Sequence, residues 1–308
     1  MDDVIRIGLL GLGTIARTHL RVLDLLPRTE VAFGVDPAEA TAATPAGVPV
    51  HRTLEEALAH HGEPDLLVIA TPTPTHVELL GAVLDLTGAP VLVEKPLSAS
   101  AAELDCLERR HGTEELIRRV RVAHHFAFSP EVVAAERLVR EHAPAATPRR
   151  ILCSFNDPYV HKQDAERASL VSSWVDSGPN HLSLLSRFVT GFRVVEREES
   201  VDGFTTHCRL RYDGGSALLV ANWWAADSSK QTSLHFDDGT EVRMDHTSMT
   251  AMAVRKGRLL DHVRDDGERE RKVAHYEELY RALLDGTAGR ETGYSLGREL
   301  ASVLEHRA

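Results

Sequence analysis

Two glycines near the start of the chain, Gly11 and Gly13, separate an apolar run from a helical pattern. The run Ile7-Gly8-Leu9-Leu10 leads into a Gly-x-Gly-x-x-Ala segment that ends at Ala16. This spacing suits a pyrophosphate, because the first glycine allows a tight turn and the second lets the backbone approach the phosphates. Amides at the N-terminus of the following helix then face the anion. A glycine turn of this kind also serves as a plain strand-to-helix corner, so a second signal is needed.

That second signal is Asp36, which ends another apolar run, Val31 to Val35. It lies about 20 residues past the glycines, where a carboxylate can bind the ribose hydroxyls of an adenine dinucleotide. The same negative charge repels the 2′-phosphate of NADP, and Pro37, the next residue, cannot neutralise it. Together the glycines and Asp36 predict a nicotinamide dinucleotide site that takes NAD in preference to NADP.

Two further polar segments follow apolar runs, and ligands bind beyond the carboxyl ends of the strands in a doubly wound sheet. The first, Thr71 to His76, contains two prolines that hold it extended, so its hydroxyls and amides can contact the cofactor; the alternative is a rigid entry loop for a helix. The second is Glu94-Lys95-Pro96. Near a nicotinamide, the ammonium of Lys95 can hydrogen-bond the oxygen of the carbon that gives or accepts hydride. Its position at a strand end favours this role over a solvated salt bridge.

Candidate substrate-binding residues come later in the chain. Asp176 and Asn180 are four residues apart, so their side chains can share one helix face; the alternative is that Asp176 only caps the helix. We expect this helix over residues 178–188, with Pro179 in its first turn. His125 follows an apolar strand and is either a pocket residue or a buried structural histidine.

The order of elements needed to position these groups predicts two domains. Uniformly apolar strands alternate with helices at first, which indicates a doubly wound parallel sheet covered on both faces, a Rossmann domain over residues 1–127. From about residue 150, β-like segments follow one another with turns at Asp213-Gly214-Gly215 and Asp237-Asp238-Gly239. Residues 128–308 are therefore predicted to form an α+β domain with a large, mainly antiparallel sheet.

Composition excludes several classes of protein. The chain has 308 residues and a formal net charge of −11, so no global field favours nucleic acid or an anionic membrane. Three scattered cysteines fit neither a disulfide framework nor a metal site, and no metal is predicted. No apolar run reaches the roughly 18 residues of a membrane span, and the acidic start is unlike a signal peptide. We expect a cytoplasmic protein.

The motifs resemble those of the Gfo/Idh/MocA oxidoreductase family, in the same order and spacing from residue 5 to about residue 190. The matching pieces are the segment Gly11 to Ala16 with His19, the loop Ala70 to His76, Glu94-Lys95-Pro96, the segment His125 to Pro130, and Asp176-Ser177-Gly178. The resemblance implies that Lys95 is the catalytic lysine, that the substrate is a sugar, cyclitol or derivative, and that the second sheet joins subunits in a homodimer or homotetramer.

One position departs from the family pattern. The family's Asp-x-Gly-x-His motif places histidine where this chain has Asn180, and His181 is one residue later. One residue turns a helical side chain by about 100°, so His181 cannot simply replace the missing base. The motif Asp-x-Gly-x-Asn resembles the aldose 1-dehydrogenase branch, the galactose and arabinose dehydrogenases, which oxidises a hemiacetal to a lactone.

The sequence thus predicts an NAD(P)-dependent oxidoreductase that moves hydride between nicotinamide and a carbinol carbon. Predicted catalytic residues are Lys95 and Asp176, which handle the hydroxyl proton, and Asn180 and His125, which orient the substrate. Predicted cofactor-binding residues are Gly11, Gly13, Thr14, Ile15, Asp36, Thr71, Pro72, His76, Glu94 and Lys95. The alternatives are an imine or ketone reductase, an NAD-using glycosidase, and a non-catalytic sensor of dinucleotide.

Overall fold

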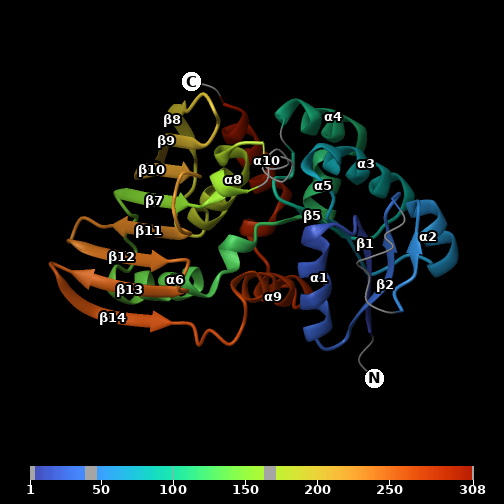
Figure 1. Ribbon diagram of the computed structural model, residues 1–308, viewed down its shortest axis with the longest axis horizontal. Coiled ribbons are helices and arrows are strands. Elements are labelled where there is room, and N and C mark those ends of the chain that lie inside the picture. Colours follow the sequence, from blue (N-terminus) through green and yellow to red (C-terminus); the bar gives the residue numbers. More distant parts are fainter. Residues whose placement is uncertain (1–3, 39–46, 99, 163–170, 307–308) are drawn as a thin grey trace. The chain divides into compact units, whose positions relative to one another are not determined.

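The computed structural model describes residues 4–38, 47–98, 100–162 and 171–306, which form two compact units (Figure 1). The first unit contains the chain up to Ala123 together with Tyr276–Ala301. The second contains His124–His275 and the residues from Ser302 onward. No helix in the described ranges is long and apolar enough to cross a membrane.

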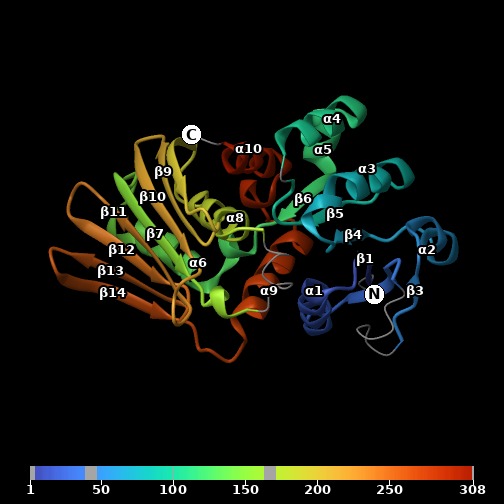
Figure 2. The same ribbon diagram turned by 45° about the horizontal axis from the view of Figure 1, so that its top comes forward.

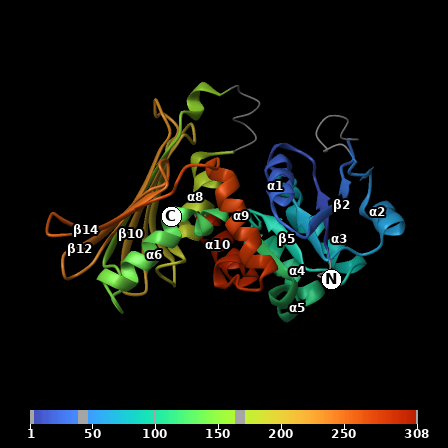
Figure 3. The ribbon, with the colours of Figure 1, turned by 90° about the horizontal axis from the view of Figure 1, so that it is seen from below.

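The first unit is built on a six-stranded parallel sheet in the order β3-β2-β1-β4-β5-β6. Its strands are β1 (Ile5–Leu10), β2 (Thr29–Val35), β3 (Val50–His51), β4 (Leu66–Ile69), β5 (Val91–Glu94) and β6 (Val120–Ala123). Its helices are α1 (Thr14–Leu25), α2 (Leu54–His61), α3 (His76–Leu86), α4 (Ala101–His111) and α5 (Thr113–Arg119), joined by α9 (Arg271–Leu284) and α10 (Tyr294–Glu305) where these run through Tyr276–Ala301. Figure 3 shows α1 on one side of this sheet and α3, α4 and α5 on the other. The strand order reverses between β1 and β4, which is where such sheets bind ligands.

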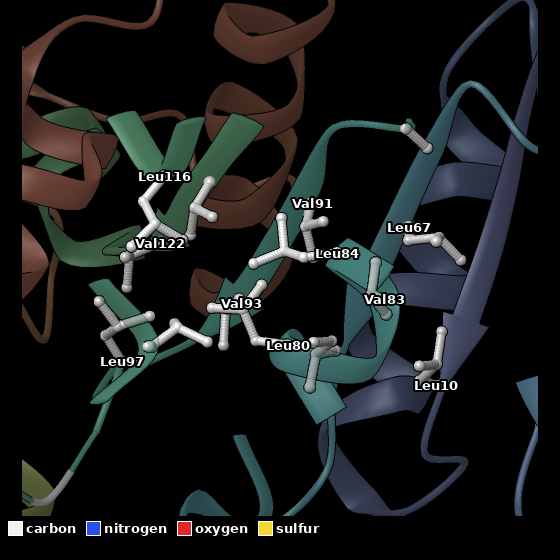
Figure 4. Close-up of a cluster of buried hydrophobic side chains, with 14 of the residues drawn as sticks. Leu10, Leu67, Leu80, Val83, Leu84, Val91, Val93, Leu97, Leu116 and Val122 are labelled. Carbon is white, nitrogen blue, oxygen red and sulfur yellow. The ribbon is translucent and has the colours of Figure 1, made fainter. Parts of the chain in front are cut away.

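Both faces of this sheet are buried, because its strands are apolar at successive positions rather than at alternate ones. On the face that α3 covers, Leu80, Val83 and Leu84 pack among strand residues from β1 to β6 (Figure 4). The labelled strand residues there are Leu10, Leu67, Val91, Val93 and Val122, with Leu97 and Leu116 beside them. This packing fixes the strand ends that carry the predicted site residues.

The second unit is built on an eight-stranded mixed sheet in the order β14-β13-β12-β11-β7-β10-β9-β8. Its strands are β7 (Arg150–Asn156), β8 (Arg193–Glu199), β9 (Thr205–Tyr212), β10 (Gly215–Asn222), β11 (Ser229–His235), β12 (Thr240–Asp245), β13 (Thr250–Arg255) and β14 (Arg258–Arg264). Neighbouring strands are antiparallel except for β7 and β10. Helices α6 (Pro130–His142) and α8 (Ser173–Leu185) lie on one face (Figures 2 and 3). The predicted fold class and both hairpin turns are confirmed; the sheet's role in oligomerisation stays a prediction.

Several elements differ from the prediction. Helix α8 begins at Ser173 rather than at residue 178, because the hydroxyl of Ser172 caps it by accepting the amide of Val175, at 3.4 Å, and Pro179 lies inside the helix. The sequence analysis missed α5, the short strand β3, and β8, β13 and β14. Both β8 and β14 are edge strands rich in charged residues, which protect a sheet edge but hide the alternation that marks a strand.

The division of the chain into two units also differs from the predicted domain boundary at residues 127/128. The segment Tyr276–Ala301 belongs to the first unit, not to the second. Tyr294 donates to Glu108 at 3.0 Å, and Arg298 pairs with Asp105, both on α4. Helical periodicity predicts that such segments are helices, but it does not say which core they join.

Candidate active site

The glycine turn has the geometry of a phosphate cradle. Gly11 has a φ of +87°, in the left-handed region, and a Cβ there would lie 2.9 Å from the carbonyl oxygen of Ala70. A Cβ on Gly13 would meet nothing within 4 Å, so the space above it is open. Gly13 is also the N-cap of α1 and offers no side chain to cap it, and no acidic residue lies in the helix's first turn. An anion can therefore take the position that a capping side chain fills elsewhere.

Asp36 and the glycines line one cleft of about 560 Å³ in the first unit. The amide of Leu12 donates to Oδ2 of Asp36 at 3.0 Å, which ties the carboxylate to the glycine turn. Arg52, which the sequence analysis did not single out, lines the same cleft. Other lining residues include Thr53, Thr71, Pro72 and Thr75. The structure thus brings together Gly11, Gly13, Asp36, Thr71 and Pro72, while Thr14 and Ile15 follow in the first turn of α1.

The loop after β4 is braced from within. The hydroxyl of Thr75 donates to that of Thr71 at 2.7 Å and to the carbonyl of Pro72 at 2.9 Å. His76 is buried, with Nε2 at 2.9 Å from the carbonyl oxygen of Thr71 and Nδ1 at 2.8 Å from that of Pro96. His76 therefore links the loop after β4 to the loop after β5, and its contact with a cofactor stays a prediction.

Glu94, at the end of β5, is buried in a satisfied hydrogen-bond network. Its Oε1 accepts the hydroxyl of Tyr276 at 2.5 Å and lies 3.1 Å from Nε2 of His19. Nδ1 of His19 lies 2.7 Å from the hydroxyl of Tyr280. Burial alone would raise the pKa of Glu94, but His19, Tyr276 and Lys95 together hold that pKa below its usual value. Both carboxylate oxygens of Glu94 thus bond neighbouring groups of the protein. Its contact with a cofactor stays a prediction.

Lys95 follows directly and is partly exposed at the carboxyl end of β5. Its backbone amide donates to Oε2 of Glu94 at 3.1 Å. The Glu94 carboxylate, fixed by helices α1 and α9, therefore anchors the backbone from which the Lys95 side chain extends. Sequence reasoning identified Lys95 and Glu94, but it gave Glu94 a role in cofactor binding and did not single out Tyr276 or Tyr280.

In the second unit, Asp176 and Asn180 lie in successive turns of α8, as their spacing predicts. Nδ2 of Asn180 donates to the backbone carbonyl of Asp176 at 3.3 Å. Because Ser172 caps the helix, the Asp176 carboxylate is not its cap. Gly178, between them, is required by packing, since a Cβ there would lie 2.8 Å from Leu304 and 3.1 Å from the ring of Trp174.

His181 is fully buried and packs edge-on against Phe155, with ring centroids 4.3 Å apart. Neither of its ring nitrogens has a hydrogen-bond partner among the described residues. Burial, with Lys230 and His246 nearby, lowers the pKa of His181 to about 3. The imidazole is therefore neutral at physiological pH, and it makes no polar contact that would suit a proton-transfer group.

We expect His181→Leu to stabilise the protein in mild acid. The unfolded chain binds a proton at position 181 near pH 6.5 and the folded chain only near pH 3, so wild-type stability falls as the pH drops between these values. The change in free energy of unfolding that the substitution causes should be about 2 kcal/mol more favourable at about pH 5 than at about pH 7.5. Urea unfolding at both pH values measures this gain, and equal effects at the two would contradict it.

Other buried polar residues of the second unit were missed by sequence reasoning. Nζ of Lys230, on β11, pairs with the carboxylate of Asp157, and both side chains are almost fully buried. The hydroxyl of Ser228 donates to Asp157 at 3.1 Å. His125, which the sequence analysis named as a candidate site residue, is buried beside His275, which it did not name. Such residues stand singly in the sequence, and the fold alone brings them together.

One cluster of three side chains has the spacing of metal ligands, but an arginine guanidinium already pairs with its carboxylates. Glu141, His142 and Asp261 bring ligand atoms within 4.8 Å of one another. Arg137 donates to Glu141 at 2.9 Å and to Asp261 at 3.4 Å. The guanidinium thus supplies the positive charge that these carboxylates need.

The N-terminal part of the chain matches a known family. Residues 5–122 match the sequence model of the oxidoreductase family GFO_IDH_MocA, NAD-binding Rossmann fold. The chain is similar to the rhizopine catabolism protein MocA of Rhizobium meliloti, 36% identical over 32% of this chain and 31% of that protein. It is similar to inositol 2-dehydrogenase of Mycolicibacterium smegmatis, 33% identical over 45% and 41% of the two chains. The chain thus spans less than half the length of these relatives.

Solved structures share the fold over nearly the whole chain. An inositol dehydrogenase homolog from Azotobacter vinelandii, complexed with NADH and myo-inositol, has a TM-score of 0.79 at 19% identity, covering 99% of this chain and 94% of that one. GenD2 from gentamicin A biosynthesis, in complex with NAD, has a TM-score of 0.78 at 22% identity, covering 100% and 94%. The glycine turn, the Asp36 cleft and the match to the family model agree: residues 5–122 form a Rossmann domain similar to the NAD-binding domain of the Gfo/Idh/MocA oxidoreductases.

Proposed function

We propose that this protein is an NAD-dependent dehydrogenase acting on a CH–OH group of a cyclitol, sugar or sugar derivative. The observation that carries the proposal is the cleft of the first unit, which combines an uncapped helix N-terminus at Gly13 with the carboxylate of Asp36. The names of the relatives, which include inositol 2-dehydrogenases, support this class of substrate.

The residues present fit a dinucleotide. The open space above Gly13 and the amides of the first turn of α1 suit a pyrophosphate, and Asp36 suits the ribose hydroxyls. Its negative charge favours NAD over NADP. Arg52 lines the same cleft and could attract a 2′-phosphate, so the two coenzymes must be compared directly. When bound, NAD supplies the acceptor for the hydride.

The chain's own residues handle the substrate. Lys95, at the end of β5, gives or takes the hydroxyl proton through Nζ. Asp176 assists through its carboxylate, and Asn180 and His125 orient the substrate's hydroxyl groups. The Asp-x-Gly-x-Asn pattern favours an aldose oxidised at carbon 1, whereas the named relatives favour a cyclitol. Both kinds of substrate therefore belong in the test.

The test measures NADH formation with myo-inositol, galactose and arabinose, and repeats each assay with NADP. We expect turnover of at least one of these substrates, faster with NAD. NAD binding without turnover across the panel would favour the sensor alternative. Release of sugar from a glycoside without net NADH would favour the glycosidase, and reduction of an imine or ketone without alcohol oxidation would favour the reductase.

A further inference from the structure

Two histidines of the second unit form a buried pair. His125 lies in the 3₁₀ turn His125–Phe128, and His275 lies near the start of α9. Their Nδ1 atoms are 3.2 Å apart, and the side chain of His275 is completely buried. Because two facing nitrogens bond only when one carries a proton, the tautomer of one ring fixes that of the other.

A carboxylate lies beside this pair. Glu131, on α6, is completely buried, and its Oε1 accepts Nδ1–H of His246 at 2.7 Å. Burial alone would raise the pKa of Glu131, but His246, then His275 and Ser129, hold it below its usual value. The hydroxyl of Ser129 donates to the carbonyl of Phe126 at 3.0 Å. Glu131 is therefore an ionised acceptor.

Two atoms of this cluster are complementary and unpaired. Neither Nε2 of His275 nor Oε2 of Glu131 has a hydrogen-bond partner within the described ranges. Burial, with Arg271, His246 and Lys272, lowers the pKa of His275 to about 3, against the opposing charge of Glu131. The His275 ring is therefore neutral and has one proton to place. The negative charge of Glu131 acts on this ring, so a proton on the unpaired Nε2 is more favourable than a bare nitrogen there, and the proton belongs on Nε2.

From these contacts we propose that Glu131 and His275 are positioning residues that fix the tautomer of His125. Glu131 holds the His275 proton on Nε2 through its negative charge, relayed by one buried water. Nδ1 of His275 then accepts the Nδ1–H of His125, which leaves Nε2 of His125 unprotonated. His125 is thus a hydrogen-bond acceptor for a substrate hydroxyl group and not a donor. This last step rests on the proposed function; the tautomer itself does not.

Nitrogen NMR of histidine-labelled protein, without cofactor or substrate, tests the tautomer. An unprotonated ring nitrogen resonates far from a protonated one. We expect His125 to show a protonated Nδ1 and a bare Nε2, and His275 the reverse pattern. Assignment comes from the signals lost in His125→Asn and His275→Asn. A wild-type His125 with its proton on Nε2 overturns the proposal, whatever the variants do.

The variant Glu131→Gln tests whether Glu131 fixes the tautomers of the two histidines. Its amide oxygen should keep the bond from His246 and place a donor NH₂ group where the unpaired Oε2 was. The negative charge that favours a proton on Nε2 of His275 is then gone and a donor replaces the acceptor, so both histidines should switch tautomer. The matched control is Glu277→Gln, another buried carboxylate, which is bonded to Arg281 and should leave both histidines unchanged. An unchanged His125 in a folded Glu131→Gln variant overturns the proposal.

Kinetics test the link to the substrate. Because the switched His125 offers a donor in place of an acceptor, Glu131→Gln should raise KM roughly threefold to tenfold, the worth of one hydrogen bond, and change kcat less. An unchanged KM overturns the assignment of His125 to a substrate hydroxyl. If the wild type turns over no sugar, the proposed function fails while the NMR result still decides the tautomer.

Discussion

Lys95→Ala should lower kcat at least about 100-fold, because a positioned acid–base group contributes that much or more to proton transfer. The affinity for NAD should change little, since the cleft that holds Gly13 and Asp36 does not include Lys95. Stopped-flow measurement of NADH formation gives the rate, and fluorescence titration gives the affinity. Near-normal turnover would remove Lys95 from the mechanism.

Two further variants show whether the loss of rate comes from lost proton transfer or from lost positive charge. Lys95→Arg keeps the positive charge but cannot release its proton, so it should be nearly as slow as Lys95→Ala if proton transfer matters. If only the charge matters, it should recover much of the rate. Lys256→Ala is the matched control, because Lys256 is exposed in the turn between β13 and β14. It should retain full activity.

Lys230→Met should destabilise the protein by about 3–5 kcal/mol, because it leaves the buried carboxylate of Asp157 without its counter-charge. Burial lowers the pKa of Lys230, whereas the carboxylate of Asp157 opposes that fall, as expected for a buried ion pair. Chemical unfolding measures the loss in free energy of unfolding.

The double variant Lys230→Met/Asp157→Asn should recover much of that loss, because no unpaired charge remains. Arg118→Ala provides the contrast: Arg118 pairs with Glu115 on the surface, where solvent screens the two charges, so its loss should change the free energy of unfolding far less. A Lys230→Met variant within about 1 kcal/mol of wild type would show that the pair is not held out of water.

The site of the first unit could be predicted because its signals are local in sequence. The positive φ of Gly11 and the position of Asp36 at a strand end both follow from short segments. Arg52 could not be found this way. It follows β3, a strand of two residues that carries no periodic signal, and it reaches the cleft through the fold of the sheet.

The polar interior of the second unit was harder to predict. Lys230, Thr232 and Leu234 alternate along β11 and all face inward. That alternation was the one available sign that a lysine would be buried. Its partner Asp157 lies 73 residues away in the chain, and His125 and His275 are 150 apart. No local pattern links residues at such separations; the tertiary fold does.

The return of Tyr276–Ala301 to the first unit has a consequence for synthesis. A ribosome makes the six strands of the Rossmann sheet first, but the hydroxyl groups that complete the surroundings of Glu94 and His19 are translated only after the segment His124–His275 of the second unit. Until then the nascent chain lacks the hydroxyl that donates to Glu94 and the hydroxyl that bonds His19. The hydrogen-bond network of the first unit can therefore be completed only when translation is almost finished. A fragment that stops at Ala123 would lack both tyrosines and could not complete it.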